Sequence, residues 1–162
     1  MSCDVKCSPS HTRMEIEEEI KLIESAQIVN FSTINSDGFP NMRPMANLRN
    51  PTSNPHLVEI FEGERNRFST YLTTYKGSQK VKDIENNNKV SLFFIDMKTG
   101  GALTVFGTVE MVEDDDFKKR LWNDEWKRSY PAGADDPNYG VLRFTAEKVR
   151  SSFHGKSNVH AV

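Results

Sequence analysis

The spacing of hydrophobic residues changes after about residue 25, from the period of a helix to the alternation of strands. Three isoleucines recur at helical spacing with glutamates between them, Ile16, Ile20 and Ile23, and they predict a helix over about 13–25. Downstream, short runs rich in β-branched and aromatic residues are separated by turn-forming residues. The pattern predicts a series of strands that follows one amphipathic helix.

The strands are predicted to arrive in hairpins. They cover residues 27–34, 39–48, 68–74, 90–97, 102–112, 142–145 and 149–153. A helix over 78–86 crosses between two of them, another helix begins at Asp114, and the apolar segment 57–61 fits either a short helix or a strand. Hairpin connections favour an antiparallel barrel over a parallel α/β sheet. The predicted fold class is mainly β, with six or seven strands and short helices.

The length of 162 residues fits one domain. We expect a flexible N-terminal tail over residues 1–12, a domain over 13–154 and a mobile C-terminal tail over 155–162. Cys3 and Cys7 lie together near the N-terminus, so they cannot cross-link the fold. Stability must therefore come from packing.

Composition limits the classes of function. Hydrophobic residues make up 36% of the chain, but its apolar runs, such as 90–95, fall far short of the roughly 20 residues that span a membrane. The polar N-terminus does not have the pattern of a signal peptide, so we expect a cytoplasmic protein. A net charge of −2 argues against a general nucleic-acid binder. It is compatible with a small anionic ligand held by a few local cations.

The segment from Thr73 to Lys80 has the composition of a phosphate site. It joins the end of a predicted strand to the start of a predicted helix, where free backbone N–H groups favour an anion. The hydroxyls of Thr73, Thr74 and Ser78 and two lysines lie within these eight residues, and a phosphate needs such donors and cations. The alternative is ordinary N-capping by Ser78, with the lysines in solvent.

Arg43 lies inside a run of apolar residues on the second predicted strand. Because an unpaired buried charge is costly, such an arginine needs either solvent or a fixed anionic partner. The planar guanidinium fits a phosphate group with two parallel hydrogen bonds. The pattern thus leaves two possibilities, a phosphate ligand or an arginine that faces outward.

Several short segments carry a resemblance to a known family. The first hairpin contains Ser32-Thr33-Ile34, Asp37-Gly38-Phe39-Pro40 and Arg43-Pro44-Met45. Further segments are Tyr71-Leu72-Thr73-Thr74, Ser78-Gln79-Lys80-Val81, Asn88 to Phe94, Gly107 to Asp114, Leu121-Trp122 and Tyr130 to Pro137. In this order, over about residues 28–150, the sequence resembles the pyridoxamine-phosphate-oxidase-like FMN-binding split barrels, and most closely their general-stress-protein branch.

The resemblance implies a six-stranded antiparallel split β-barrel that forms a homodimer, with flavin mononucleotide (FMN) bound between the subunits. The implied cofactor-binding residues are Arg43, Pro44, Met45, Thr73, Thr74, Ser78, Gln79 and Lys80.

Within this set the resemblance also implies individual roles. Ser78 and Lys80 would hold the phosphate, Arg43 would contact the phosphate or the ring edge, and Met45 would lie beside the isoalloxazine ring. The two threonines at the strand end would bond the ribityl chain or polar ring atoms.

The implied function is that of an FMN-dependent oxidoreductase with a small-molecule redox substrate, in which the flavin supplies the redox chemistry. The sequence identifies no catalytic acid or base. In the oxidases proper a lysine follows the arginine on its strand, whereas the run from Arg43 to Leu48 has none, which argues against vitamin B6 oxidation. The alternatives are a flavin-binding or redox-sensing protein without turnover, or a haem-binding barrel with His56 or His154 as axial ligand.

Two further groups of residues each have a structural and a functional interpretation. An aromatic series at spacings of four either packs in the core or dimer interface or stacks near a flavin: Trp122, Trp126 and Tyr130. Asp135-Asp136-Pro137 is interpreted as a turn rather than a metal site, because no histidine accompanies it.

The N-terminal segment has one possible metal motif. Three potential ligands recur every four residues, Cys3, Cys7 and His11, and on a helix they would share a face. The alternative is a pair of exposed, oxidation-prone thiols. We therefore predict no metal site.

Overall fold

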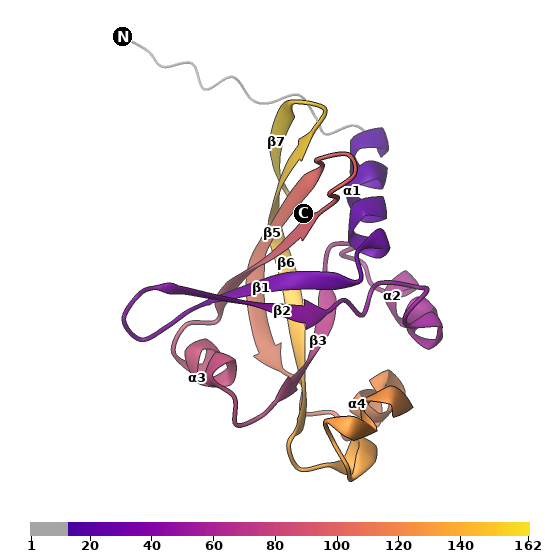
Figure 1. Ribbon diagram of the computed structural model, residues 1–162, viewed down its shortest axis with the longest axis vertical. Coiled ribbons are helices and arrows are strands. Elements are labelled where there is room, and N and C mark those ends of the chain that lie inside the picture. Colours follow the sequence, from indigo (N-terminus) through magenta and orange to yellow (C-terminus); the bar gives the residue numbers. More distant parts are fainter. Residues whose placement is uncertain (1–12) are drawn as a thin grey trace.

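The computed structural model describes residues 13–162, and its main feature is one antiparallel sheet of seven strands (Figure 1). The strands are β1 (Ile28–Ile34), β2 (Pro40–Ala46), β3 (Thr70–Tyr75), β4 (Lys89–Ile95), β5 (Ala102–Met111), β6 (Tyr139–Phe153) and β7 (Lys156–Ala161). Their order in the sheet is β2-β1-β4-β5-β6-β3, and β7 pairs with β6. The possible metal motif of Cys3, Cys7 and His11 lies outside the described residues.

Four short helices surround the sheet: α1 (Arg13–Ser25), α2 (Val58–Glu62), α3 (Gln79–Asn86) and α4 (Asp115–Leu121). Three 3₁₀ turns accompany them, η1 (Pro55–Leu57), η2 (Asp124–Arg128) and η3 (Gly133–Asp135). The segment 57–61, which the sequence left open, is helical. No helix in residues 13–162 is long and apolar enough to span a membrane.

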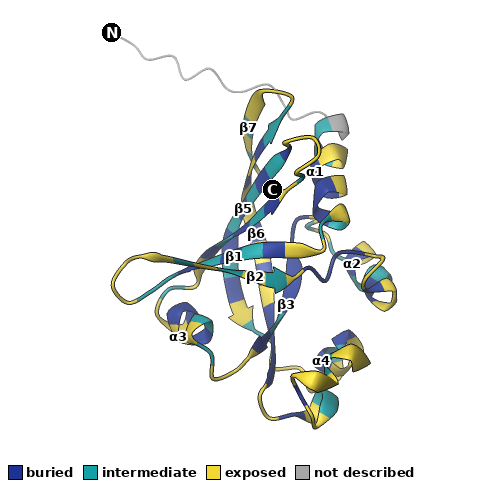
Figure 2. Cartoon of the chain, viewed as in Figure 1, coloured by how far each residue is buried: buried dark blue, intermediate teal, exposed yellow. Residues whose placement is uncertain are grey.

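The main core lies between α1 and the inner face of the sheet. Burial alternates along β1, where Val29, Phe31 and Thr33 are buried and their neighbours are more exposed. The same alternation along β4 and β5 supplies further core residues, and α1 adds Ile20 and Ile23. Figure 2 shows the resulting buried bands on the strands and on the sheet side of α1. The alternation that predicts the strands is thus the alternation that builds the core.

β6 replaces the two closing strands that the sequence predicts. Its pairing with β5 shifts between Phe106 and Gly107, so that Glu147 has no partner and forms a β-bulge. A side chain at Gly107 would be impossible in this arrangement, because its Cβ would lie 2.0 Å from the carbonyl oxygen of Thr145. The break in the alternation near residue 147 therefore marks a bulge within one long strand.

The C-terminal segment differs from the predicted mobile tail. Residues Lys156–Ala161 form β7, which returns along β6. His160 reaches Glu19 of α1 at 2.9 Å, and its ring packs edge-on against Phe68. A polar segment of this kind carries little hydrophobic signal, because its contacts are with residues far away in the sequence. It adds a seventh strand to the six-stranded barrel that the resemblance implies.

The sheet does not close into a complete barrel. β2 and β3 are its two edges, and they lie against each other without forming a ladder. This opening confirms the predicted antiparallel split barrel with short helices. Since α3 directly follows β3, the opening also determines where the candidate site lies (Figure 1).

Candidate functional site

The candidate site lies where β2 meets the segment between β3 and α3. Arg43 comes from β2, whereas Thr74 ends β3 and Ser78 and Lys80 begin α3. Arg43 and Lys80 are close enough for the charge of Arg43 to lower the pKa of Lys80, in addition to a larger effect of burial. The fold therefore brings the two predicted cationic segments together.

Arg43 is held on the inner face of the sheet. It pairs across the ladder with buried Phe31, and its Nη1 donates to Thr33 Oγ1 at 2.8 Å. Its Nη2 lies 3.7 Å from Asp83 Oδ2, and 19% of its side chain is exposed. Burial lowers the pKa of Arg43, while Asp83 opposes this shift. The outward-facing alternative is therefore wrong, and the arginine has a fixed anionic partner within the protein.

Asp83 is the buried acid of this cluster, with 1% of its side chain exposed. It accepts hydrogen bonds from Thr33 at 2.8 Å, from Gln79 at 3.0 Å and from Asn41 at 3.5 Å. The amide of Gln79 is the largest cause of the lowered pKa of Asp83, followed by Thr33, Asn41 and the charge of Arg43. Asp83 thus orients Arg43 as a carboxylate, both directly and through the Thr33 hydroxyl.

Sequence reasoning missed three members of this cluster, Asp83, Thr33 and Asn41. A signal for two of them exists, because Thr33 and Asn41 face each other in the hairpin register and share the alternation of Arg43. Asp83 gives no such signal. It lies between two apolar residues of α3, and only the docking of that helix against β1 reveals its partners.

Ser78 stands at the N-cap of α3, but its side chain makes no capping hydrogen bond. Its hydroxyl instead accepts from Lys80 Nζ at 3.2 Å and lies 3.4 Å from the hydroxyl of Thr74. The ordinary capping role is therefore wrong for this serine. The first N–H groups of a helix have no intrahelical partner. In α3 the Ser78 side chain does not cap them, and Lys80 lies in the same first turn.

The remaining predicted residues are distributed around this cluster. Met45 packs against the main core, and Gln79 uses its amide to hold Asp83. Pro44 points to the opposite, exposed face of β2, and Thr73 points to the opposite face of β3 from Thr74, because neighbouring strand residues alternate. The structure therefore assembles Arg43, Thr74, Ser78 and Lys80, but not Pro44 and Thr73.

The aromatic series does not lie on one helix, since α4 ends at Leu121 and a 3₁₀ turn follows. Its three rings surround Tyr139, with centroids 5.2 Å (Trp122), 6.3 Å (Trp126) and 5.2 Å (Tyr130) away. Tyr139 is buried, donates to the carbonyl of Lys118 and has a raised pKa because of its burial. The core-packing interpretation of these rings is confirmed.

The Asp135–Pro137 segment is a turn, as predicted. The carboxylate of Asp136 accepts from the backbone N–H groups of Ala132 at 3.1 Å and Asn138 at 2.9 Å. Within residues 13–162 no group of three or more His, Cys, Asp or Glu side chains is placed to hold a metal ion.

The two histidines considered as haem ligands lie on separate elements. His56 is exposed on η1, and His154 is exposed at the turn between β6 and β7, where it lies 3.1 Å from Glu18. Neither histidine is part of the cluster described above, which we name the Arg43–Lys80 cluster. Its residues are Arg43, Thr74, Ser78 and Lys80, with Thr33, Asn41 and Asp83 around Arg43.

Comparison of the chain with known proteins identifies a matching family and several similar structures. The family model described as pyridoxamine 5'-phosphate oxidase matches residues 16–153. No curated protein matches the chain.

Among solved structures, a Clostridium acetobutylicum protein related to general stress protein 26 is similar, with 29% identity and a TM-score of 0.77 over 94% of this chain and 97% of that one. General stress protein 26 from Bacillus anthracis has 23% identity and a TM-score of 0.68, over 92% and 100%. A haem-binding protein from Mycobacterium smegmatis has 14% identity and a TM-score of 0.65, over 90% and 57%.

Proposed function

Since this chain belongs to the pyridoxamine 5'-phosphate oxidase family, we propose that it binds FMN at the Arg43–Lys80 cluster and acts as a flavin-dependent oxidoreductase. The observation that carries the proposal is an excess of positive charge at one place. Arg43 and Lys80 interact with each other, and the acid paired with Arg43 is Asp83. Because like charges repel at short distance, an added anion would stabilise both cations.

The chemistry of the donors favours a phosphate group. The guanidinium of Arg43 supplies parallel N–H groups, Lys80 supplies a compact ammonium, and Ser78 supplies a hydroxyl. The start of α3 adds uncapped backbone N–H groups and the positive end of its dipole. These donors come from both edges of the split sheet, so they can surround a phosphate rather than touch it from one side.

The protein residues would bind and orient the cofactor, and FMN when bound would supply the hydride or electron transfer. Asp83 and Thr33 fix the direction of Arg43 before any ligand arrives, which reduces the entropy cost of binding. Met45, beside Arg43 on the inner face of β2, would border the ring. The missing lysine after Arg43 makes vitamin B6 a poor substrate candidate, so the redox substrate belongs to another class.

We further propose that FMN lies in the interface of a homodimer. The outer face of the sheet carries a groove of about 600 Å³, lined by residues that include Ser91, Phe106 and Lys148. Met42 and Ile28, on the same outer face, are 65% and 57% exposed. Exposed apolar side chains of this size are typical of interaction surfaces. A second copy of the chain would cover them.

The experiment that tests FMN binding is a fluorescence titration of the protein with FMN. The double variant Arg43→Ala/Lys80→Ala should weaken binding by several kcal/mol at most, as charged hydrogen bonds contribute about 1.5–3 kcal/mol each. Lys82→Ala is the matched control, because Lys82 is an exposed lysine of the same helix. Unchanged affinity in a folded double variant would refute the phosphate assignment.

The redox role and the haem alternative need separate measurements. An absorbance spectrum of the purified protein distinguishes flavin bands from the Soret band of haem. Anaerobic mixing of the FMN complex with a reduced nicotinamide should bleach the flavin if the protein is a reductase, and no bleaching would leave a flavin-binding protein without this turnover. Native mass spectrometry would show whether two FMN molecules accompany two chains.

A further inference from the structure

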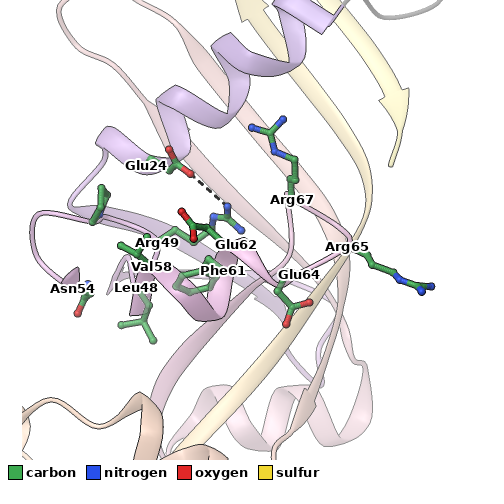
Figure 3. A pocket seen from close by; sticks show the side chains of 11 residues that line it. Glu24, Leu48, Arg49, Asn54, Val58, Phe61, Glu62, Glu64, Arg65 and Arg67 are labelled. Atoms are coloured by element: carbon green, nitrogen blue, oxygen red, sulfur yellow. Dashed lines mark ion pairs between the residues drawn. The ribbon is translucent and has the colours of Figure 1, made fainter. Parts of the chain in front are cut away.

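A cavity lies away from the Arg43–Lys80 cluster, between α1, the loop after β2, α2 and the segment that leads to β3. Its volume is about 530 Å³, within the range of small-molecule sites. Leu48, Val58 and Phe61 form part of its wall, and arginines and glutamates form much of the rest (Figure 3). We name this cavity the Arg49 pocket after its most buried charged residue.

Arg49 is a buried cation whose hydrogen bonds are incomplete. Only 4% of its side chain is exposed, and its Nη1 donates to the carbonyl of Ser69 at 2.9 Å. Its Nη2 lies 3.6 Å from Glu24, and its Nε has no acceptor in the described part of the chain. The guanidinium lies over the ring of Phe61 at 4.9 Å (Figure 3). A buried charge of this kind gains from a closer anion.

The acid beside Arg49 can give way to another acid. The side chain of Glu24 is 45% exposed, so water competes for its carboxylate and little holds it in place. Burial also lowers the pKa of Arg49, which shows how little solvent reaches the cation, and Glu24 only partly opposes this. A ligand carboxylate could therefore take the position that Glu24 now occupies while Glu24 turns toward solvent.

Two other charged residues of the pocket are already engaged. Arg67 forms a bidentate ion pair with Glu17, in which its Nη1 and Nη2 donate to the two carboxylate oxygens at 2.7 and 3.0 Å. Glu64 accepts from the hydroxyl of Tyr71 at 2.5 Å and lies 3.7 Å from Arg143. Burial and Glu64 raise the pKa of Tyr71 to about 12, so this donor stays protonated. Arg65 also borders the pocket, but its side chain points away from the other lining residues (Figure 3). Arg49 is thus the buried cation of the pocket whose hydrogen bonds are incomplete.

The surrounding glutamates restrict the charge of that ligand. Glu24, Glu62 and Glu64 all line the pocket and would repel a dianion such as phosphate more strongly than a monoanion. The apolar wall would receive a hydrocarbon group. We propose that the Arg49 pocket is a second ligand site, which binds a small organic monocarboxylate with an apolar body. This proposal does not rest on FMN binding.

The test is a calorimetric titration of the full chain with hexanoate, and in parallel with inorganic phosphate, each with and without FMN. Hexanoate should bind saturably at millimolar concentrations or below, and phosphate should bind the pocket at least tenfold more weakly. Arg49→Gln should weaken hexanoate binding at least tenfold, whereas Glu24→Gln should leave it equal or tighter. Arg128→Gln, at an exposed arginine of η2, is the matched control and should change nothing.

A second variant keeps the proposal testable if Arg49→Gln fails to fold. Val58→Trp fills the apolar side of the pocket without removing the guanidinium, and it should also weaken hexanoate binding at least tenfold. The proposal is overturned if hexanoate does not bind saturably, or if binding survives in folded Arg49→Gln or Val58→Trp. It is equally overturned if Glu24→Gln weakens hexanoate binding, or if phosphate binds the pocket as tightly as hexanoate does.

Discussion

Two arginines, one in β2 and one in the loop after it, pair with their acids in opposite ways. Arg43 is partly exposed, but its acid, Asp83, is almost fully buried, with side-chain exposures of 19% and 1%. The Arg49–Glu24 pair has the opposite arrangement, because 4% of the arginine side chain and 45% of the glutamate side chain are exposed. In the first pair the acid is the fixed member, and in the second pair the fixed member is the cation.

The difference gives the two arginines different capacities. Asp83 holds Arg43 in one orientation while part of the arginine side chain stays exposed, and a preorganised phosphate site needs a cation held in this way. Arg49 is held by Ser69 and Phe61 instead, and its acid can be exchanged. The burial of the acid, rather than the ion pair itself, decides which arrangement results.

The largest expected effect comes from removing each acid in turn. Asp83→Ala should lower the free energy of unfolding by about 3–5 kcal/mol, because it leaves Arg43 without its buried partner and removes the acceptor of Thr33 and Gln79. Glu24→Ala should cost about 0–1 kcal/mol, since its acid is half in solvent. Urea unfolding of both variants measures the difference.

Equal losses in the two variants would contradict this comparison. Asp83→Asn is the informative control, because it keeps the volume and several hydrogen bonds while it removes the charge. It should fall between the wild type and Asp83→Ala. A loss as large as that of the alanine variant would assign the whole effect to charge.

The elements that local pattern encodes were predictable. The isoleucine spacing gives α1, the alternation gives the first hairpin, and the turn before α3 gives the segment that carries Ser78 and Lys80. Arg43 could also be selected, because a charge inside an apolar strand is unusual. Each of these signals lies within a few residues of the feature that it predicts.

The parts that depend on distant partners were not predictable. β7 is held by β6 and by contacts between His160 and α1, and Asp83 acquires its role only when α3 docks on β1. Arg49 and Glu24 come together only through the fold. The capping alternative for Ser78 could not be rejected from the sequence either, since a cap and a lysine acceptor look the same there.

A smaller effect is expected from protonating Asp83. Its folded-state pKa lies below the unfolded value of about 3.9, mainly because of the Gln79 hydrogen bond. Asp83 therefore stabilises the fold above about pH 4, and this contribution is lost as the pH falls through the lowered folded pKa. The loss should be smaller than in Asp83→Ala, because a protonated acid still fills its site. Urea midpoints between about pH 5 and pH 2.5 should fall more steeply in the wild type than in Asp83→Asn, and parallel curves would show that Asp83 does not contribute.

The smallest effect is expected at a third arginine, Arg67, which completes the comparison. Its pair with Glu17 has the best geometry of the three, with contacts of 2.7 and 3.0 Å, yet the two side chains are 46% and 52% exposed. If burial of the acid decides the strength of the pair, Glu17→Gln should cost only about 0–1 kcal/mol, and less at high salt. A loss of unfolding free energy as large as that of Asp83→Ala would mean that short, bidentate geometry outweighs burial. The Arg67–Glu17 and Arg43–Asp83 pairs differ most in these two respects, geometry and burial.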